Sequence, residues 1–129
     1  MPPEPFEYAV LRVVPRVERG EAVNVGVVLF CRTRGYLAAR VELAARQRAA
    51  LAALSGDLDV DVVQAHLDEV MRIVDGEPES GPIAALEAPE RFRWVTSPSS
   101  TVIQPSEVHG GVTEWPERSL DDLFGRLVR

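Results

Sequence analysis

The chain has no lysine, so all of its basic residues are arginine, and it has a single cysteine, Cys31. With Cys31 alone, no disulfide can form within the chain, and a lone thiol in an apolar run is typical of a reducing compartment. No stretch approaches the roughly 18 consecutive apolar residues that a membrane-spanning helix needs. The proline-rich N-terminus also lacks the basic and apolar regions of a signal peptide. We therefore expect a cytoplasmic protein without a membrane segment.

Motifs for metals, cofactors and covalent catalysis are scarce as well. The two histidines, His66 and His109, are isolated in the sequence, and with one cysteine they cannot supply a closed zinc shell. Aspartates alternate over residues 57–61, but a calcium loop would need glycine where Val62 stands, so helix capping explains them better. There is no P-loop, no dinucleotide fingerprint and no Gly-x-Ser-x-Gly elbow. We expect no metal and no cofactor, and we assign no catalytic residue.

What is present is the composition of an ordinary globular domain. The 129 residues are 46% hydrophobic and 26% charged, which excludes wholesale disorder and fits one domain over residues 1–129 with a flexible tail at 1–5. The net charge of −6 is unevenly spread. Residues 12–48 hold eight arginines against three glutamates, whereas the remainder holds six arginines against seventeen acidic residues. The N-terminal third is therefore basic and the rest acidic.

Alternation and residue type predict the strands. Residues 6–14 and 23–30 are rich in β-formers and apolar on both faces, so we expect a central antiparallel hairpin with residues 16–21 as its loop. In the strand expected at residues 91–95, alternation places Phe92 and Trp94 together on a buried face. The same criteria predict two other strands, at residues 36–41 and 101–103.

Helical patterns fill the space between these strands. We expect an alanine-rich helix over residues 42–54 and a second helix, capped by Asp59 or Asp61, with apolar residues at helical spacing to Val74. Two further helices are expected, a short one over residues 82–89 and a last one from Ser119. The order β-β-β-α-α-α-β-β-α predicts an α+β fold, with a mainly antiparallel sheet of four to five strands and three to four helices on one side.

Some polar residues interrupt the expected strands and form the candidate site. A buried arginine must be paired, because an uncompensated buried charge is very costly. One hypothesis is an anion- or partner-binding cleft in which arginines supply charge-assisted forks and neutral amides add hydrogen bonds. The candidates are Arg12, Asn24, Arg40, Arg93 and Gln104. The alternative is that the arginines are structural and pair internally with Glu7, Glu42 or Glu90.

Several sequence blocks are similar to those of one known family. They are Tyr8–Pro15, Glu18–Glu21, Val23–Phe30, Gly81–Ile83, Arg91–Trp94 and Ser100–Ser106. Together the blocks resemble the bacterial family catalogued as domain of unknown function 3037, with the Asn-Val-Gly-Val-Val-Leu-Phe run as the most specific part. The resemblance implies no activity. Family members are often encoded beside kinases of the HipA-like type, which implies the role of a partner or regulator.

Three functions remain open at this point. The first is a non-catalytic interaction or accessory module that binds a kinase-like partner or an anionic small molecule. The second is a small enzyme for a phosphate- or carboxylate-bearing substrate, with a hydroxyl of residues 97–101 or His109 as the reacting group. The third is a nucleic-acid binder, against which the acidic total and the lack of lysine weigh. Whether the chain forms a homo-oligomer is also open.

Overall fold

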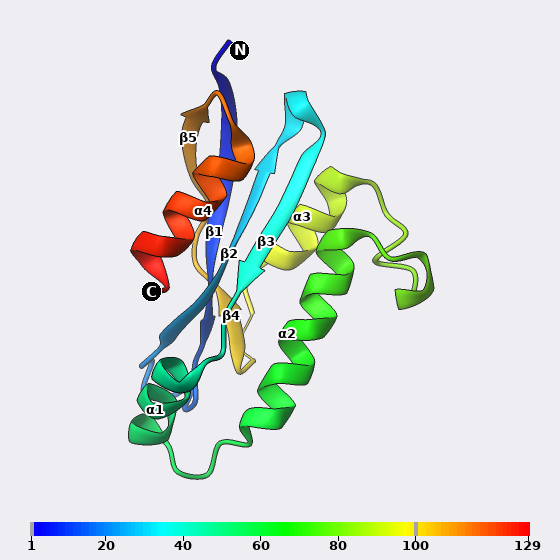
Figure 1. Cartoon of the computed structure of the whole chain (residues 1–129). Coiled ribbons are helices and arrows are strands. Elements are labelled where there is room, and N and C mark those ends of the chain that lie inside the picture. The colour runs from blue at the N-terminus through cyan, green and yellow to red at the C-terminus, as the bar shows by residue number, and fades with distance from the viewer. Residues whose placement is uncertain (1, 100) are drawn as a thin grey trace.

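The N-terminal half of the chain forms the centre of an antiparallel sheet (Figure 1). The structure is a computed structural model that describes residues 2–99 and 101–129. Strand β1 (Glu4–Val13) pairs with β2 (Val23–Cys31), which in turn pairs with β3 (Tyr36–Val41). The predicted central hairpin and the third strand are therefore confirmed.

The other side of β1 is lined by two short strands from the C-terminal part of the chain. Strand β4 (Ile103–Pro105) pairs with residues 11–13, and β5 (His109–Thr113) pairs with residues 4–8. Ser106 lies between them and continues the pairing, because its N–H donates to the Val10 carbonyl at 2.7 Å and its hydroxyl accepts from the Val10 N–H at 2.8 Å. The described residues thus form a five-stranded antiparallel sheet, and the predicted single α+β domain is confirmed.

Helices cover both faces of this sheet, so the expectation that all helices lie on one side is wrong. One face, here the α2 face, carries three helices, α1 (Ala45–Leu54), α2 (Val60–Asp75) and α3 (Ala88–Thr96). Helix α4 (Pro116–Leu127) covers the opposite face, here the α4 face. The physical reason is that β1 and β2 are apolar on both faces, and each apolar face must be shielded from water.

A β-bulge in β2 sets the side on which its polar residue lies. Leu11 pairs with Gly26 and Arg12 with Asn24, so Val25 is an extra residue in the ladder. Val25 is fully buried on the α2 face, whereas Asn24 lies under α4 and donates to the Leu127 carbonyl at 3.0 Å. The bulge therefore couples the centre of the sheet to the end of α4.

Gly26, next to this bulge, has no room for a side chain. A Cβ on Gly26 would lie 2.8 Å from Val41 Cγ1 and 2.9 Å from the Arg40 carbonyl oxygen. Each residue of the Asn-Val-Gly run of β2 thus has a structural role. The Asn24 amide binds the end of α4, Val25 forms the bulge, and Gly26 packs without a side chain against β3.

The region around Pro89 differs from the expectation. Residues 91–95 are not a strand but part of α3. In place of the helix expected over residues 82–89, residues 82–86 form turns and α3 begins at Ala88. Pro89 lies in the first turn of α3, where its missing N–H costs no hydrogen bond. Phe92 is buried and Trp94 is 48% exposed, so the expectation that they share a buried face is wrong. On a helix, residues two positions apart point in different directions.

None of the helices in the described part of the chain is long and apolar enough to cross a bilayer.

Candidate functional site

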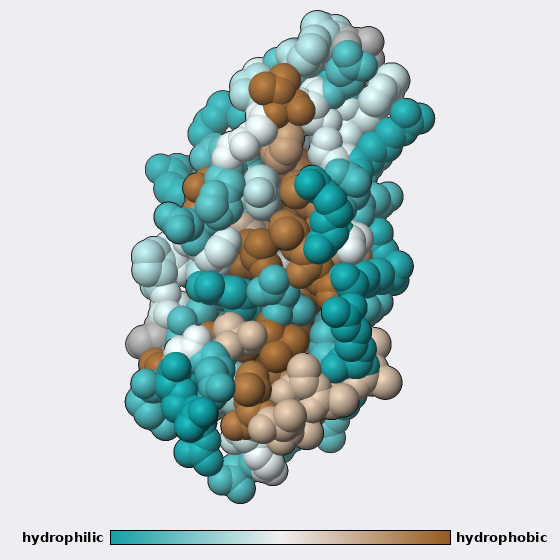
Figure 2. Space-filling model, turned by 90° about the vertical axis from the view of Figure 1, so that its left-hand side faces the viewer, coloured by the Kyte–Doolittle hydropathy of each residue, from teal (hydrophilic) through white to brown (hydrophobic). Residues whose placement is uncertain are grey.

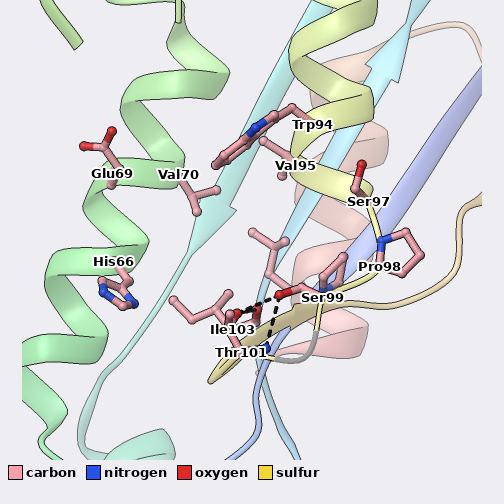
Figure 3. A pocket seen from close by; sticks show the side chains of 12 residues that line it. His66, Glu69, Val70, Trp94, Val95, Ser97, Pro98, Ser99, Thr101 and Ile103 are labelled. Atoms are coloured by element: carbon pink, nitrogen blue, oxygen red, sulfur yellow. Dashed lines mark hydrogen bonds between the residues drawn. The ribbon is translucent and has the colours of Figure 1, made fainter. Parts of the chain in front are cut away.

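A groove with a cavity of about 430 Å³ opens on the α2 face, between α2, α3 and the segment 97–105 (Figure 3). The most buried of its lining residues are apolar: Leu11 of β1 is 1% exposed and Val95 of α3 is 7% exposed. The cavity is lined by Leu11, His66, Glu69, Val70, Trp94, Val95, Ser97, Pro98, Ser99, Thr101, Ile103 and Pro105.

The unequal lengths of the two helices create this groove. Helix α2 has 16 residues and α3 only 9. Pro98 follows the end of α3, and a residue that precedes proline is disfavoured in the helical region. The chain therefore leaves the helix at Ser97 and returns to the sheet as β4. The half of α2 around His66 is left without a helix beside it, and the groove occupies that space.

Trp94 forms one wall of the groove and is its largest exposed apolar group. Figure 3 shows its indole reaching from α3 toward Val70 of α2. The Trp94 residue is 48% exposed, whereas Val95 beside it is only 7% exposed. On the α2 side of the rim lie His66 and Glu69, and Glu69 is held by Arg72 at 2.7 Å. The groove thus combines an apolar floor, a half-exposed indole and a polar rim.

The hydroxyl groups at the lip of the groove bind to one another. The Ser99 and Thr101 hydroxyls are 2.7 Å apart, and the Thr101 hydroxyl donates to the Ile103 carbonyl at 2.9 Å. His66 makes no hydrogen bond to either of them within the described residues. His109 lies far along the sheet edge on β5, where its ring is 5.4 Å from that of Tyr8. Within the described residues, His109 therefore makes no hydrogen bond to Ser97, Ser99 or Thr101, and the two reacting groups considered for an enzyme do not lie in one site.

Three of the five candidate polar residues form a row across the sheet. Arg12 pairs in register with Asn24 on one side and with Gln104 on the other. Each side chain donates to a backbone carbonyl: Arg12 to Pro105 at 3.1 Å, Asn24 to Leu127 at 3.0 Å and Gln104 to Thr101 at 2.8 Å. The Arg12 Nε is buried without a hydrogen-bond partner among the described residues. These contacts connect β1, β4 and α4.

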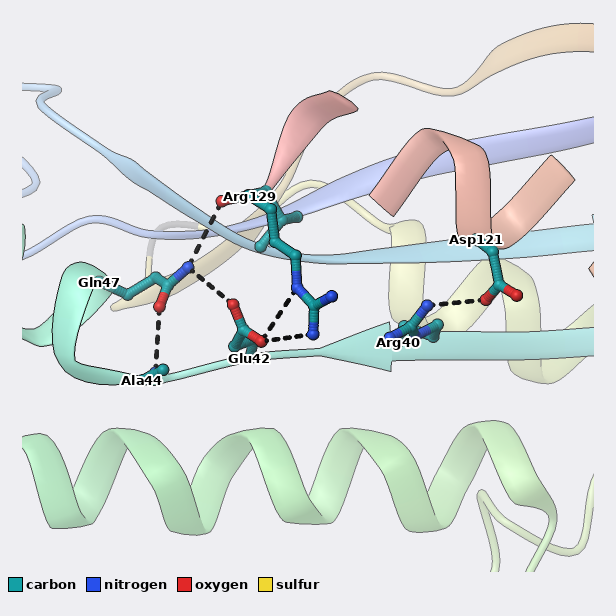
Figure 4. A network of polar contacts seen from close by, with 7 residues as sticks. Arg40, Glu42, Ala44, Gln47, Asp121 and Arg129 are labelled. Atoms are coloured by element: carbon teal, nitrogen blue, oxygen red, sulfur yellow. Dashed lines mark hydrogen bonds and ion pairs between the residues drawn. The ribbon is translucent and has the colours of Figure 1, made fainter. Parts of the chain in front are cut away.

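The other two candidates lie apart from this row. Arg40 is held on the α4 face by Asp121 at 2.8 Å (Figure 4). Its guanidinium also lies over the Phe124 ring, 4.4 Å from the ring centroid. Arg93 is exposed on α3, over the opposite face, and makes no ion pair within the described residues. The structure therefore does not bring the five candidates into one site, and their role in anion binding stays a prediction.

Glu42 is one of the internal partners that the sequence suggested, but it pairs with a residue that was not considered. Arg129 contacts the Glu42 carboxylate at 3.0 Å, and the Gln47 amide donates to its second oxygen at 3.3 Å (Figure 4). The hydrogen bond from Arg129 is the main reason that the pKa of Glu42 is lowered from its ordinary value of 4.5. This network ties the end of the chain to the link between β3 and α1.

The described residues contain no cluster of three histidine, cysteine or acidic side chains that could hold a metal ion. The groove between α2 and α3 is suited to binding another molecule through its shape, its apolar lining and a few polar groups at its rim.

Comparison with known proteins gives one result. The model of the family described as "Protein of unknown function (DUF3037)" matches residues 8–128. No curated protein and no solved structure matches the chain.

Proposed function

The chain belongs to the DUF3037 family, and from that premise we propose that it acts by binding a protein partner through the groove between α2 and α3. The partner we propose is a kinase of the HipA-like type, the class that the family resemblance implies. The observation that carries the proposal is the 430 Å³ groove with its half-exposed tryptophan. Tryptophan is, with tyrosine and arginine, enriched among the few residues that contribute most of the binding energy of protein interfaces.

The exposed part of Trp94 sets the scale of the expected affinity. A tryptophan side chain can bury up to about 250 Å², so 48% exposure leaves on the order of 120 Å² of the indole accessible. At about 25 cal/mol per Å², covering that area contributes roughly 3 kcal/mol to binding. An apolar side chain of the partner that fills the groove would add to this value.

Arg93 is the candidate arginine best placed to support this contact. It directly precedes Trp94, it is exposed, and it has no ion-pair partner within the described residues. Arg40 is already occupied by Asp121, and Arg12 donates to the Pro105 carbonyl. We therefore propose that Arg93 binds an acidic group of the partner. Of the arginines that the sequence suggested for partner binding, this assigns the contact to the one beside the groove.

An enzyme for an anionic substrate is less well supported. General base catalysis requires a base within hydrogen-bond reach of the group that it activates. In the groove His66 is the only histidine among the described lining residues, and it contacts neither Ser99 nor Thr101. Both hydroxyls serve to order the lip instead.

A nucleic-acid binder is also less well supported, because the chain is acidic overall and three of the eight arginines of its basic N-terminal third form ion pairs. Arg19 pairs with Glu21, and Arg40 pairs with Asp121. Affinity for nucleic acid depends largely on free cationic groups that contact phosphates. To contact a phosphate, each of these paired arginines would first have to give up its carboxylate partner.

The experiment is co-purification from the native host with the wild-type chain and two variants. Trp94→Ala removes the groove wall, and Leu86→Ala is the control, because Leu86 is an apolar residue that is 38% exposed but does not line the groove. We expect the wild type and Leu86→Ala to retain the same kinase-like partner and Trp94→Ala to lose it. Equal recovery of that partner by Trp94→Ala would refute the groove assignment. Recovery of no partner by the wild type would refute the binding function.

A further inference from the structure

Strand β5 forms an open edge with an unusual concentration of exposed apolar side chains. In the described part of the chain seven large hydrophobic residues are exposed, and three lie in or beside β5: Val108 at 40%, Val112 at 69% and Trp115 at 40%. Figure 2 shows apolar residues gathered in a strip down the side of the molecule that carries β5 and α4, flanked by hydrophilic residues. Exposed apolar side chains that gather in this way are typical of interaction surfaces.

The backbone of β5 is unprotected as well. Its partner within the described residues is β1, so its outer side presents backbone N–H and C=O groups to solvent. Natural proteins usually protect such an edge with lysine, proline or inward-pointing charge. The strand His-Gly-Gly-Val-Thr carries none of these. It is therefore suited to pairing with another strand.

The two glycines of β5 differ in what the single chain requires of them. A Cβ on Gly111 would lie 2.6 Å from the Phe6 ring, so the monomer explains that glycine. A Cβ on Gly110 would meet only the Phe6 carbonyl oxygen, at an ordinary 3.7 Å, and Gly110 does not have a positive φ. Glycine weakens a strand and often marks the close approach of another backbone. Among the residues that the structure describes, no other backbone makes such a close approach at Gly110.

We propose that β5 pairs antiparallel with β5 of a second copy of this chain, about a two-fold axis at Gly111. In that register Val112 of each copy lies directly opposite Gly110 of the other. Residues 110 and 112 point to the same face of the strand, as their partners Glu7 and Pro5 in β1 do. The absent side chain at Gly110 leaves room for the exposed Val112, so the strand contains both halves of the contact.

A second copy fits this edge better than an unrelated strand for two reasons. Antiparallel pairing of identical strands is an isologous contact, in which the same patch supplies both surfaces. The acidic residues next to the strand, Glu107 and Glu114, are also not placed opposite their own copies. In the proposed register they lie opposite Trp115 and Val108, so no like charges face each other directly.

The experiment measures self-association of the full chain by sedimentation equilibrium over roughly 5–500 µM, a range suited to an interface smaller than standard size. We expect a monomer–dimer equilibrium for the wild type. Gly110→Glu and Val112→Lys should each be monomeric, because each places two like charges near the two-fold axis. Val62→Lys, a matched control at a 50% exposed position on α2, should dimerise as the wild type does.

The double variant Gly110→Glu/Val112→Lys tests the register itself. It places each new lysine directly opposite a new glutamate of the other copy, so we expect the dimer to return. A wild type that stays monomeric over the whole range would overturn the proposal. Single variants that dimerise normally, or a double variant that stays monomeric, would overturn it too. Circular dichroism melts of every variant establish that the monomer is folded.

Discussion

Replacement of Gly26 by alanine tests the account of the sheet centre. The new Cβ would lie 2.8 Å from a Val41 methyl and 2.9 Å from the Arg40 carbonyl oxygen, and real Cβ atoms do not approach other atoms so closely. The carbonyl belongs to the backbone of the paired strand and cannot turn away. Overpacking of this kind costs about 3 kcal/mol. Alanine is also favoured over glycine in a strand by about 0.5–1 kcal/mol, so the net loss in the free energy of unfolding is roughly 2 kcal/mol.

Thermal and urea unfolding of Gly26→Ala measure this loss. For a domain of this size roughly 2 kcal/mol corresponds to a fall in Tm of about 6–10 °C. Gly125→Ala is the control: it lies in α4 with nothing within 4 Å of its Cβ position, and we expect it to raise stability by about 0.5–1 kcal/mol. If Gly26→Ala unfolds at the wild-type temperature or above it, β2 and β3 leave room for a side chain at Gly26, which would refute the close contact between the two strands.

Three further predictions concern stability. Trp94→Ala should lower the free energy of unfolding by only about 1–2 kcal/mol, less than the 3–5 kcal/mol of a core tryptophan, because the residue is 48% exposed; a larger loss in urea unfolding would contradict the groove geometry. Ser106→Ala should cost about 1–3 kcal/mol, because it leaves the buried Val10 N–H without its acceptor, whereas Ser106→Thr should retain most of the stability. Because Arg129 lowers the pKa of Glu42, the contact stabilises the fold above the ordinary value of 4.5 and is lost as the pH falls through the lowered pKa. Stability of Glu42→Gln should therefore depend less on pH in this acidic range, and an unchanged pH profile would show that the contact contributes nothing.

The central hairpin could be predicted because local and tertiary signals agree. Residues 6–14 and 23–30 are β-formers by residue type, and their apolar content on both faces requires a central place in the sheet. The bulge at Val25 could not be predicted, because it is visible only in the register between β1 and β2. That register also decides that Asn24 faces α4.

The sequence predicts a strand where α3 lies, because this short segment fits both the two-residue period of a strand and the 3.6-residue period of a helix. Phe92 and Trp94 alternate with arginines as in a strand, whereas Ala88, Phe92 and Val95 have helical spacing. Only the packed structure shows that Phe92 and Val95 are buried and Trp94 is exposed. The exposed tryptophan that forms the groove wall was therefore expected to be a core residue.

The groove and β5 depend on contacts that the sequence does not encode locally. The groove is built by residues from β1, α2, α3 and β4, which are distant in the sequence and share no motif. Strand β5 contains two glycines, which are poor β-formers, and it exists because β1 offers a free edge beside β4. In contrast, Pro98 is a local sequence feature that explains why α3 ends where it does.

The most direct test of the central claim is the affinity between this chain and the purified HipA-like kinase of the same genome, measured by isothermal titration calorimetry. Since covering Trp94 contributes roughly 3 kcal/mol, we expect Trp94→Ala to bind at least about tenfold more weakly than the wild type. Leu86→Ala, at an exposed apolar position outside the groove, should bind with the affinity of the wild type. Equal affinity of the wild type and Trp94→Ala, or no measurable binding of the wild type, would contradict the proposal that the protein recognises its partner through this groove.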